Sequence, residues 1–298
     1  ALSERTAGLM ITNPEDTGIF NPHIREFTDA VHRVGGLCAI DQANANGTLG
    51  IVRAREFGFD MCHFNLHKSF STPHGSEGPA GGAVGVTDEL EKFLPYPVVS
   101  FDGEKYWLDY DRPQSIGKIK GFIGNVGIAI RAYAWIVAHG AKGLDTVAKT
   151  SVMNNNYLMS LMSDVQGLSI PYGTEGGYRL QEVRYSWNEL FEDTGVGTND
   201  IKNRMVDFGV NNYFTSHTPW LIPEPFTIEP PESYSKQELE EYSEIIRRVA
   251  EEAYSDPEMV KGAPYKSSIS HMDESAFVDP EKVFTTWRAW LNRESVKG

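Results

Sequence analysis

The sequence of 298 residues has few or none of the features that identify disulfide-rich, membrane-spanning, secreted or repeat proteins. It contains only two cysteines, Cys38 and Cys62, and both lie in segments that we predict as strands. We therefore expect small buried side chains there, and neither a disulfide nor a cysteine-based metal site. No apolar run is long enough to span a bilayer, and we find no signal peptide, internal repeat or low-complexity segment. The expected location is the cytoplasm, or the mitochondrial matrix in a eukaryote.

Positive charge is also scarce. Lys and Arg number 27 against 41 Asp and Glu, which gives a formal net charge of −14. An acidic chain repels nucleic acid and anionic membranes, so neither is expected as a partner. The length is sufficient for a sizeable core in one large or two smaller domains. The chain begins with Ala and not Met, which is consistent with a processed, trimmed or partial chain.

The most informative stretch runs from residue 61 to residue 85. It reads as an apolar strand that ends in a polar turn, followed by a Gly-rich segment and another apolar strand. Lys68 stands in this turn. Its polar neighbours are His67, Ser71, Thr72 and His74. An amine held where a strand leaves the core can lose its proton and attack a carbonyl carbon, so Lys68 is the first candidate catalytic residue.

Asp41 indicates which carbonyl compound the Lys68 amine would attack. It ends the apolar run 37–41, which lies 27 residues before Lys68. An Asp and a Lys at the ends of successive strands are typical of a pyridoxal phosphate (PLP) site, where the Lys forms a Schiff base and the Asp keeps the pyridine nitrogen protonated. Ala43 is small enough to pack against a ring face. The alternative is that Asp41 caps a helix and Lys68 is a solvated loop residue, but the two residues together favour PLP.

Apolar runs alternate with helical patterns in the first half of the chain, which predicts an α/β fold. We expect a helix over 21–34 with Asn21 as its N-cap, and a short helix over 51–57. The strands between them are nearly all apolar, which predicts a mostly parallel sheet that is covered on both faces.

The second half of the chain is expected to be more irregular. Residues 96–121 are predicted as a long loop, and the helices 126–139 and 143–163 are separated at Gly140. Short strands at 168–170 and 178–185 then alternate with helices over 198–208 and 235–254. We predict a domain boundary after residue 164: residues 1–164 form the C-terminal part of a large PLP-binding domain, and residues 165–298 form a small C-terminal domain with an irregular tail.

Around Asp41 and Lys68 the sequence resembles a known family. Residues 41–46 (DQANAN) and 65–75 (NLHKSFSTPHG) are similar to the cofactor segments of the P-protein of the glycine cleavage system. The similarity is to the C-terminal half of the P-protein, which is the β subunit where the enzyme is split into two chains. Further family landmarks follow in order over most of the chain, at residues 12–18, 115–117, 124–125, 131–133, 154–158 and 228–230.

This resemblance implies a PLP-dependent transferase fold of type I. It also implies that PLP-bound glycine is decarboxylated and that its aminomethyl group is passed to a lipoylated carrier, the H-protein. The Gly/Ser-rich turn that usually holds the PLP phosphate cannot be placed in this sequence, nor can the residue that stacks on the ring. We therefore expect an α-type subunit, corresponding to the N-terminal half, to carry the rest of the site.

The resemblance also implies which residues contact the cofactor: Lys68, Asp41, Ala43, Asn13, His67, Thr72, Gly124 and Asn125. Asn13 would reach the ring hydroxyl, with a simple turn-forming role as the alternative. His67 and His74 are candidates to contact phosphate, orient the substrate carboxylate or move protons. Asn125 opens a helix whose N–H groups would bind phosphate, with an ordinary helix cap as the alternative.

Several residues depart from the family pattern. Gln42 stands where the family has Gly, Glu77 interrupts a Gly/Pro run, and Gln181 stands where the family has His. These changes raise the hypothesis of a different small amino acid as substrate, or of an acceptor other than lipoamide. Two further alternatives stay open. One is another PLP reaction on the same scaffold, of the lyase or transaminase type, and the other is a non-catalytic supporting subunit.

Overall fold

A computed structural model describes residues 2–70, 72, 79–217, 220–269, 287 and 290–291. Within them the chain divides into two compact units. The first unit comprises Ala1–Asp164, Ile170–Tyr185 and Thr227–Ser243, and the second comprises Val165–Ser169, Ser186–Phe226 and Glu244–Gly298. The predicted division into domains at residues 164 and 165 stays a prediction. Among the helices in the described ranges, none has both the length and the apolar character needed to cross a bilayer.

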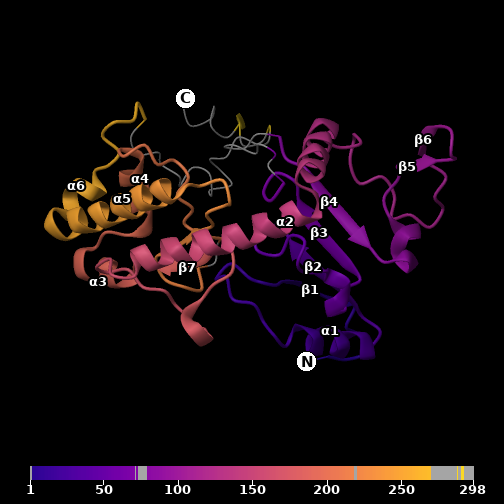
Figure 1. Ribbon diagram of the computed structural model, residues 1–298, viewed down its shortest axis with the longest axis horizontal. Helices are drawn as coiled ribbons and strands as arrows, with labels where there is room; N and C mark the ends of the chain where they lie inside the picture. The colour runs from indigo at the N-terminus through magenta and orange to yellow at the C-terminus, as the bar shows by residue number, and fades with distance from the viewer. Residues whose placement is uncertain are drawn as a thin grey trace. The chain divides into compact units, whose positions relative to one another are not determined.

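The first unit is built around a four-stranded sheet with the order β1-β2-β3-β4 (Figure 1). The strands are β1 (Gly8–Thr12), β2 (Leu37–Gln42), β3 (Met61–Asn65) and β4 (Gly82–Val86). The first three are parallel and β4 runs antiparallel to β3. The mostly parallel sheet was predicted. The antiparallel β4 was not, and it follows β3 without a helix in the described part of the connection, whereas a parallel neighbour needs a long crossover.

Helix α1 (Ile24–Arg33) covers one part of this sheet. Its apolar side packs into a buried cluster that joins the helix to the sheet: Ile24, Val31, Cys38, Ile40 and Phe59. The helix begins three residues later than predicted. The reason is that the side chain of Asn13 bonds both to the N–H of Asn21 (2.8 Å) and to its carbonyl oxygen (3.3 Å), which holds Asn21 in a turn.

A second buried cluster lies beneath the turn that carries Lys68. Its members are Ala45, Leu49, Phe70, Ala132, Val147 and Ala148. They come from the segment after β2, from the turn after β3 and from α2 (Val126–Met162). Helix α2 is broken at Gly140, whose φ of 62° and ψ of −180° are not helical. The predicted separation of two helices at Gly140 is therefore confirmed.

The segment 96–121, predicted as a loop, contains a β-hairpin, so that prediction was wrong in part. β5 (Val98–Phe101) pairs antiparallel with β6 (Tyr106–Asp109). The turn between them is held by Asp102, whose Oδ1 accepts the N–H groups of Glu104 and Lys105, both at 2.9 Å. Gly103 supplies a φ of 102° there. An Asp-Gly pair between short apolar runs, here Asp102-Gly103, is a hairpin signal.

The remaining helices include one long helix, α5 (Lys236–Ser255). The others are short: η1 (Ala54–Phe57), η2 (Asp88–Phe93), η3 (Glu175–Gly177), α3 (Asn188–Thr194), α4 (Thr198–Val206) and α6 (Pro257–Lys261). Two strands, β7 (Val183–Ser186) and β8 (Pro225–Ile228), pair in a separate sheet. The helices predicted over 198–208 and 235–254 are present as α4 and α5. The strand predicted at 168–170 is reduced to a single bridge between Ser169 and Ser186.

The core of the second unit is aromatic. The rings of Trp187 and Phe226 stack with centroids 5.4 Å apart, and Tyr213 stacks on Phe226 at 5.0 Å. The indole N–H of Trp187 donates to the Tyr213 hydroxyl at 2.9 Å, so the polar atom of this buried side chain is satisfied. Ile201 and Met205 of α4 are fully buried in the same unit.

Candidate active site

Lys68 lies in the turn that follows β3, at the carboxyl end of the parallel strands. Its side chain is exposed, but both of the next residues are buried. The Ser69 hydroxyl oxygen accepts the N–H of Ala45 at 2.8 Å. The Phe70 ring packs edge-on against Phe64, with centroids 6.0 Å apart. Because its neighbours are anchored in the core, the amine of Lys68 is presented from a fixed backbone.

Asp41 lies at the same end of the sheet, on β2. It stands opposite Thr12 of β1 and His63 of β3 in the register of the sheet. Its Oδ1 accepts the N–H of Ala43 at 2.8 Å, which closes a turn directly after the strand. Among the described residues, no hydrogen bond reaches the other carboxylate oxygen of Asp41. One oxygen thus fixes the carboxylate, and the second remains an acceptor.

The segment before β4 joins two of the other predicted site residues. Nδ1 of His67 lies 3.0 Å from the carbonyl oxygen of Gly81. The side-chain amide of Asn125 donates to the carbonyl oxygen of Ala80. Asn125 is the residue before α2, and its side chain makes no capping hydrogen bond to that helix. His67, which follows β3, and Asn125, which precedes α2, therefore contact neighbouring residues of the segment before β4.

Three further predicted residues have local contacts, and one falls outside the described part of the chain. Thr72 is buried, and its hydroxyl donates to the carbonyl oxygen of Leu66. Asn13 is buried and holds Asn21, which leaves one of its amide hydrogens without a described partner. Gly124 has a φ of 123° and precedes α2. His74 lies outside the described residues.

Two glutamates that we did not predict as site residues lie near Lys68. Glu182 precedes β7 and is only 7% exposed, while Glu229 follows β8 and is partly buried. The side-chain amide of Asn44 donates to Oε1 of Glu182 at 3.4 Å and also to Oε2 of Glu229. Asn44 stands three residues after Asp41, so this pair lies beside the predicted site. Asn44 and Glu229 lie in segments that match the family, and Glu182 follows the departure at Gln181. The sequence did not reveal that these three side chains meet.

The pKa values of both glutamates are raised. Burial raises the pKa of Glu182 well above its usual value, the charges of Glu229 and Asp16 raise it further, and the charge of Lys68 opposes the shift. Burial likewise raises the pKa of Glu229, against the opposing charge of Lys68 and the hydrogen bond from Asn44. Shifted carboxyl groups beside a candidate nucleophile are typical of functional sites.

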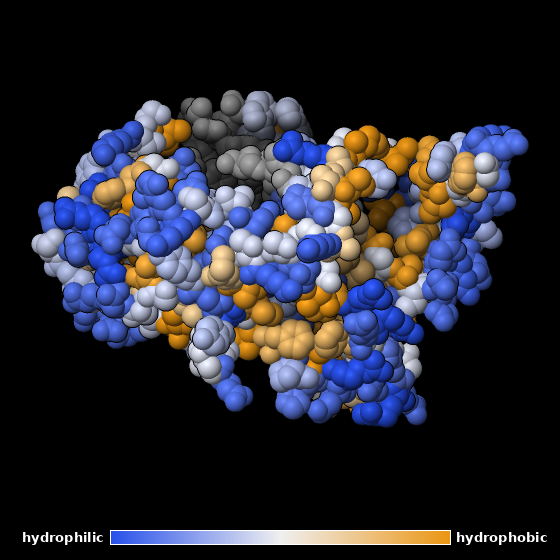
Figure 2. All heavy atoms as spheres, in the orientation of Figure 1, coloured by the Kyte–Doolittle hydropathy of each residue, from blue (hydrophilic) through white to orange (hydrophobic). Residues whose placement is uncertain are grey.

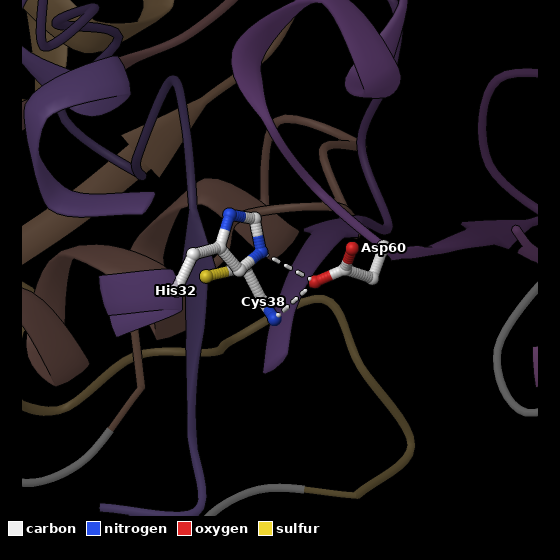
Figure 3. A group of neighbouring side chains, drawn as sticks. All are labelled: His32, Cys38 and Asp60. Atoms are coloured by element: carbon white, nitrogen blue, oxygen red, sulfur yellow. Dashed lines mark hydrogen bonds and ion pairs between the residues drawn. The ribbon is translucent and has the colours of Figure 1, made fainter. Parts of the chain in front are cut away.

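A separate cluster, drawn in Figure 3, lies at the opposite end of the strands. Oδ2 of Asp60 accepts the N–H of Cys38 at 2.9 Å and lies 2.8 Å from Nε2 of His32. Burial and the charge of Asp60 raise the pKa of the Cys38 thiol, which disfavours the thiolate that a metal would require. The hydrogen bonds instead tie the end of α1 to the starts of β2 and β3.

We therefore expect replacement of Asp60 by alanine to destabilise the first unit. The substitution leaves the buried N–H of Cys38 without its acceptor and removes the contact to His32, which should lower the free energy of unfolding by about 2 to 4 kcal/mol. Urea-induced unfolding measures this directly. D88N, which changes an exposed aspartate, is the matched control and should unfold like the wild type. Equal stability of D60A and wild type would contradict the proposed role.

Comparison with known proteins shows which sequences this chain is similar to. Residues 147–266 match the family model described as glycine dehydrogenase, C-terminal domain. The chain is 43% identical over 292 residues to a Pyrococcus horikoshii protein named "Probable glycine dehydrogenase (decarboxylating) subunit 2", which covers 97% of this chain and 57% of that protein. A protein of the same name from Thioalkalivibrio sulfidiphilus is 42% identical over 278 residues, which is 92% of this chain and 55% of its own length.

The chain is similar over nearly its whole length to proteins named glycine dehydrogenase (decarboxylating) subunit 2. The family resemblance seen in the sequence is thereby confirmed. The chain spans little more than half the length of these relatives.

Solved structures agree with the fold of this chain. A crystal structure of glycine decarboxylase (P-protein) in inhibitor-bound form aligns with a TM-score of 0.68 at 18% identity, over 83% of this chain and 56% of that chain. An aspartate aminotransferase from Thermus thermophilus aligns with a TM-score of 0.57 at 17% identity, over 84% of this chain and 66% of that one. The predicted α/β fold of type I is confirmed.

Proposed function

We propose that this chain is the part of a glycine decarboxylase that carries the PLP-binding lysine. The observation that supports it best is the position of Lys68 and Asp41 at the carboxyl ends of neighbouring parallel strands, in a chain whose relatives are named glycine dehydrogenase (decarboxylating) subunit 2. One structural neighbour, a C-DES mutant, is described with glycine covalently linked to its PLP cofactor.

The residues at this edge of the sheet fit PLP chemically. Lys68 offers an exposed amine on a fixed backbone, and Asp41 offers a carboxylate oxygen that no described residue occupies. When bound, PLP accepts the electron pair that remains after the substrate carboxylate leaves as carbon dioxide. Asp41 would favour this by keeping the ring nitrogen protonated. Lys68 would hold the cofactor through its amine.

We propose supporting roles for the other residues at this edge. Ala43 would pack against the PLP ring, and Asn13 would donate its remaining amide hydrogen to the ring oxygen. His67 is held by Gly81, so its ring has a fixed orientation from which it can orient the substrate or move a proton. Thr72 fixes the turn after Lys68 through its hydrogen bond to Leu66.

Three further residues complete the proposed site. His74 is kept as a candidate for proton transfer by family resemblance alone. Gly124 and Asn125 are proposed to contribute phosphate-binding N–H groups at the start of α2. The contact between Asn125 and Ala80 places this helix start beside the segment that also contacts His67.

We also propose a partner subunit, which an exposed apolar stripe on α2 supports. Val126, Ile130, Tyr133 and Val137 recur at intervals of four, three and four residues, and each is between 56% and 70% exposed. This spacing places them on one face of the helix, the pattern by which helices pack on each other. Figure 2 shows apolar side chains gathered over the first turns of α2 and beside the β5–β6 hairpin. Patches of this kind mark interaction sites.

Replacing Ile130 by glutamate should weaken binding of the proposed α-type subunit. A charge at the centre of an apolar contact costs about 2 kcal/mol or more, so the dissociation constant should rise about 30-fold. Sedimentation or calorimetric titration of the two purified subunits measures it. A138E, at an exposed position on another face of the same helix, should bind like the wild type, and equal weakening by both variants would refute this surface as the contact.

The remaining parts of the proposal concern the carrier and the location. We propose a lipoylated H-protein as acceptor of the aminomethyl group, because the family relatives carry the name of the decarboxylating enzyme. The relatives in Pyrococcus and Thioalkalivibrio support a cytoplasmic location.

The function is tested by exchange of labelled bicarbonate into the carboxyl group of glycine, using this chain with its partner subunit, PLP and H-protein. Exchange with glycine, and none with alanine or serine, is the expected result. Exchange with another small amino acid in place of glycine would support the hypothesis that the departures at Gln42 and Gln181 changed the substrate. No exchange with any amino acid, despite bound PLP, would contradict decarboxylation.

A further inference from the structure

The position of Lys68 relative to Asp41 is not fixed by the sheet alone. The pairing of β2 with β3 ends at Gln42 and Phe64, and Lys68 lies beyond this last pair, in the turn after β3. A lysine whose backbone has left the sheet needs other contacts to keep its amine at one distance from the Asp41 carboxylate. The next residue of the turn, Ser69, makes such a contact.

The Ser69 hydroxyl joins the turn that carries Lys68 to the segment that follows Asp41. Its oxygen accepts the N–H of Ala45 at 2.8 Å. Ser69 is 6% exposed and Ala45 is 1% exposed, so water cannot take the place of this hydrogen bond. Phe70 and Ala45 also share a buried cluster, but apolar packing is non-directional, whereas a hydrogen bond requires a defined distance and angle. The bond therefore fixes the two segments relative to each other.

The N–H of Ala45 belongs to the first residue of a helical turn. The Ala45 carbonyl oxygen accepts the N–H groups of Thr48 at 2.9 Å and Leu49 at 3.1 Å. The N–H groups at the start of such a turn need acceptors from outside it. Ser69 supplies this acceptor from another segment, in the way that a capping side chain does. A side chain without a hydroxyl at this position would leave the buried N–H of Ala45 unpaired.

The same segment is held on its other side by Asn44. The Asn44 side-chain amide donates to Oε1 of Glu182 at 3.4 Å and to Oε2 of Glu229. Its Oδ1 accepts the N–H of Asn46 at 3.1 Å, which fixes the orientation of the amide. All of these residues belong to the first unit. Residue 44 is thus anchored to the segments beside β7 and β8, and residue 45 is anchored to the turn after β3.

A continuous path of contacts links Lys68 to Asp41. It runs from Lys68 to Ser69 and across the hydrogen bond to Ala45. It then follows the chain back to Ala43, whose N–H donates to Oδ1 of Asp41 at 2.8 Å. Each step is a covalent link or a hydrogen bond, so the positions of the two ends depend on each other.

We infer that Ser69 is a positioning residue, which sets the placement of the Lys68 amine relative to the Asp41 carboxylate. This inference rests on the proposed function, in which one PLP molecule contacts both groups. Ser69 acts through these two residues, because its own hydroxyl oxygen is buried and bonded to Ala45. Loss of the hydroxyl should therefore misplace the cofactor between its two anchors without removing either anchor.

Two substitutions of equal shape isolate the hydroxyl. Valine and threonine have the same branched shape, and only Ser69→Thr keeps the hydroxyl. In the full chain with its partner subunit and PLP, Ser69→Val should lower the turnover of glycine–bicarbonate exchange by about 10- to 100-fold, the cost of a small misplacement of reacting groups. Ser69→Thr should retain most of the turnover. Ser69→Ala replaces Ser69→Val if that variant does not fold, with the same expectation.

Two further readouts do not depend on turnover. Hydrogen exchange of the Ala45 amide, measured on the full chain without PLP, reports the contact itself. This amide should be protected in the wild type and in Ser69→Thr, and it should exchange at least about tenfold faster in Ser69→Val. The visible circular dichroism of bound PLP reports the orientation of the cofactor, and it should change in Ser69→Val but not in Ser69→Thr.

Thr28→Val is the matched control for a purely structural effect. The Thr28 hydroxyl is also buried in the first unit, and it donates to the carbonyl oxygen of Phe57 at 2.8 Å. Its loss should lower the resistance to urea, as the loss of the Ser69 hydroxyl does, and should leave turnover and cofactor dichroism unchanged. If Ser69→Val matches Thr28→Val in both of these measurements, Ser69 is only structural and the inference is overturned. Equal turnover in Ser69→Val and Ser69→Thr would also overturn it.

The wild type in the same experiment distinguishes this inference from the proposed function. Borohydride should reduce PLP onto Lys68 in the wild type and in both Ser69 variants, because the amine is present in all three. If PLP attaches to wild-type Lys68 but Ser69→Val retains full turnover, the proposed function stands and the positioning role alone is refuted. If PLP does not attach to Lys68 in the wild type, the proposed function fails, and the positioning role fails with it.

Discussion

Lys68→Ala should lower glycine–bicarbonate exchange by at least about 10²- to 10⁴-fold, the range that a positioned proton-transfer or nucleophilic group contributes. The substitution removes the amine that holds the cofactor. It should leave the fold intact, because Lys68 is exposed and the turn is anchored by Ser69 and Phe70. Steady-state exchange rates at saturating glycine and PLP measure the loss.

Two matched variants make this result specific. Lys68→Arg keeps the positive charge but cannot present a neutral amine, so it should be as inactive as Lys68→Ala. K105A removes an exposed lysine of the β5–β6 hairpin and should retain full activity. Substantial activity of Lys68→Arg would contradict a nucleophilic role and would favour a purely electrostatic one.

Asp41→Asn should lower the exchange rate by about 10²- to 10³-fold, the loss typical of removing one preorganised electrostatic contact. Asparagine has the same shape and its carbonyl oxygen can still accept the N–H of Ala43, so the turn after β2 should persist. The variant lacks the negative charge that keeps the ring nitrogen protonated. The loss should therefore fall on turnover more than on the amount of PLP bound.

Absorbance of the bound cofactor separates these two effects. Asp41→Asn should bind PLP in nearly the same amount as the wild type but with an altered absorbance band, because the ring nitrogen is no longer protonated. D88N should match the wild type in both measurements. An unchanged spectrum together with unchanged turnover in Asp41→Asn would show that Asp41 does not contact the ring nitrogen.

The sequence predicted the central part of the site because its signals are local. A strand that ends in Asp and a strand that ends in a polar turn with Lys are each visible within ten residues, and parallel strands bring their carboxyl ends together. Asp41 near the carboxyl end of β2 and Lys68 in the turn after the neighbouring β3 lie at the same edge of the sheet for this reason. The alternation of strands and helices predicted the sheet in the same way.

The contacts that hold the site could not be predicted, because they depend on tertiary structure. The bond from Ala45 to Ser69 and the bonds from Asn44 to two glutamates join residues between 24 and 185 positions apart. Asn13 illustrates the same limit. Its motif allowed either a ring contact or a turn, and its bonds to Asn21 show that it forms a turn, while a ring contact remains a proposal.

The most direct test of the proposed function is the attachment of PLP to Lys68. The chain and its partner subunit are mixed with PLP, the absorbance spectrum is recorded before and after borohydride reduction, and the reduced protein is digested and mapped by mass spectrometry. We predict a cofactor absorbance band that disappears on reduction, with the pyridoxyl mass on the peptide that contains Lys68. No such band with the partner present, or the pyridoxyl group on another lysine, would contradict the PLP site and favour the supporting-subunit alternative.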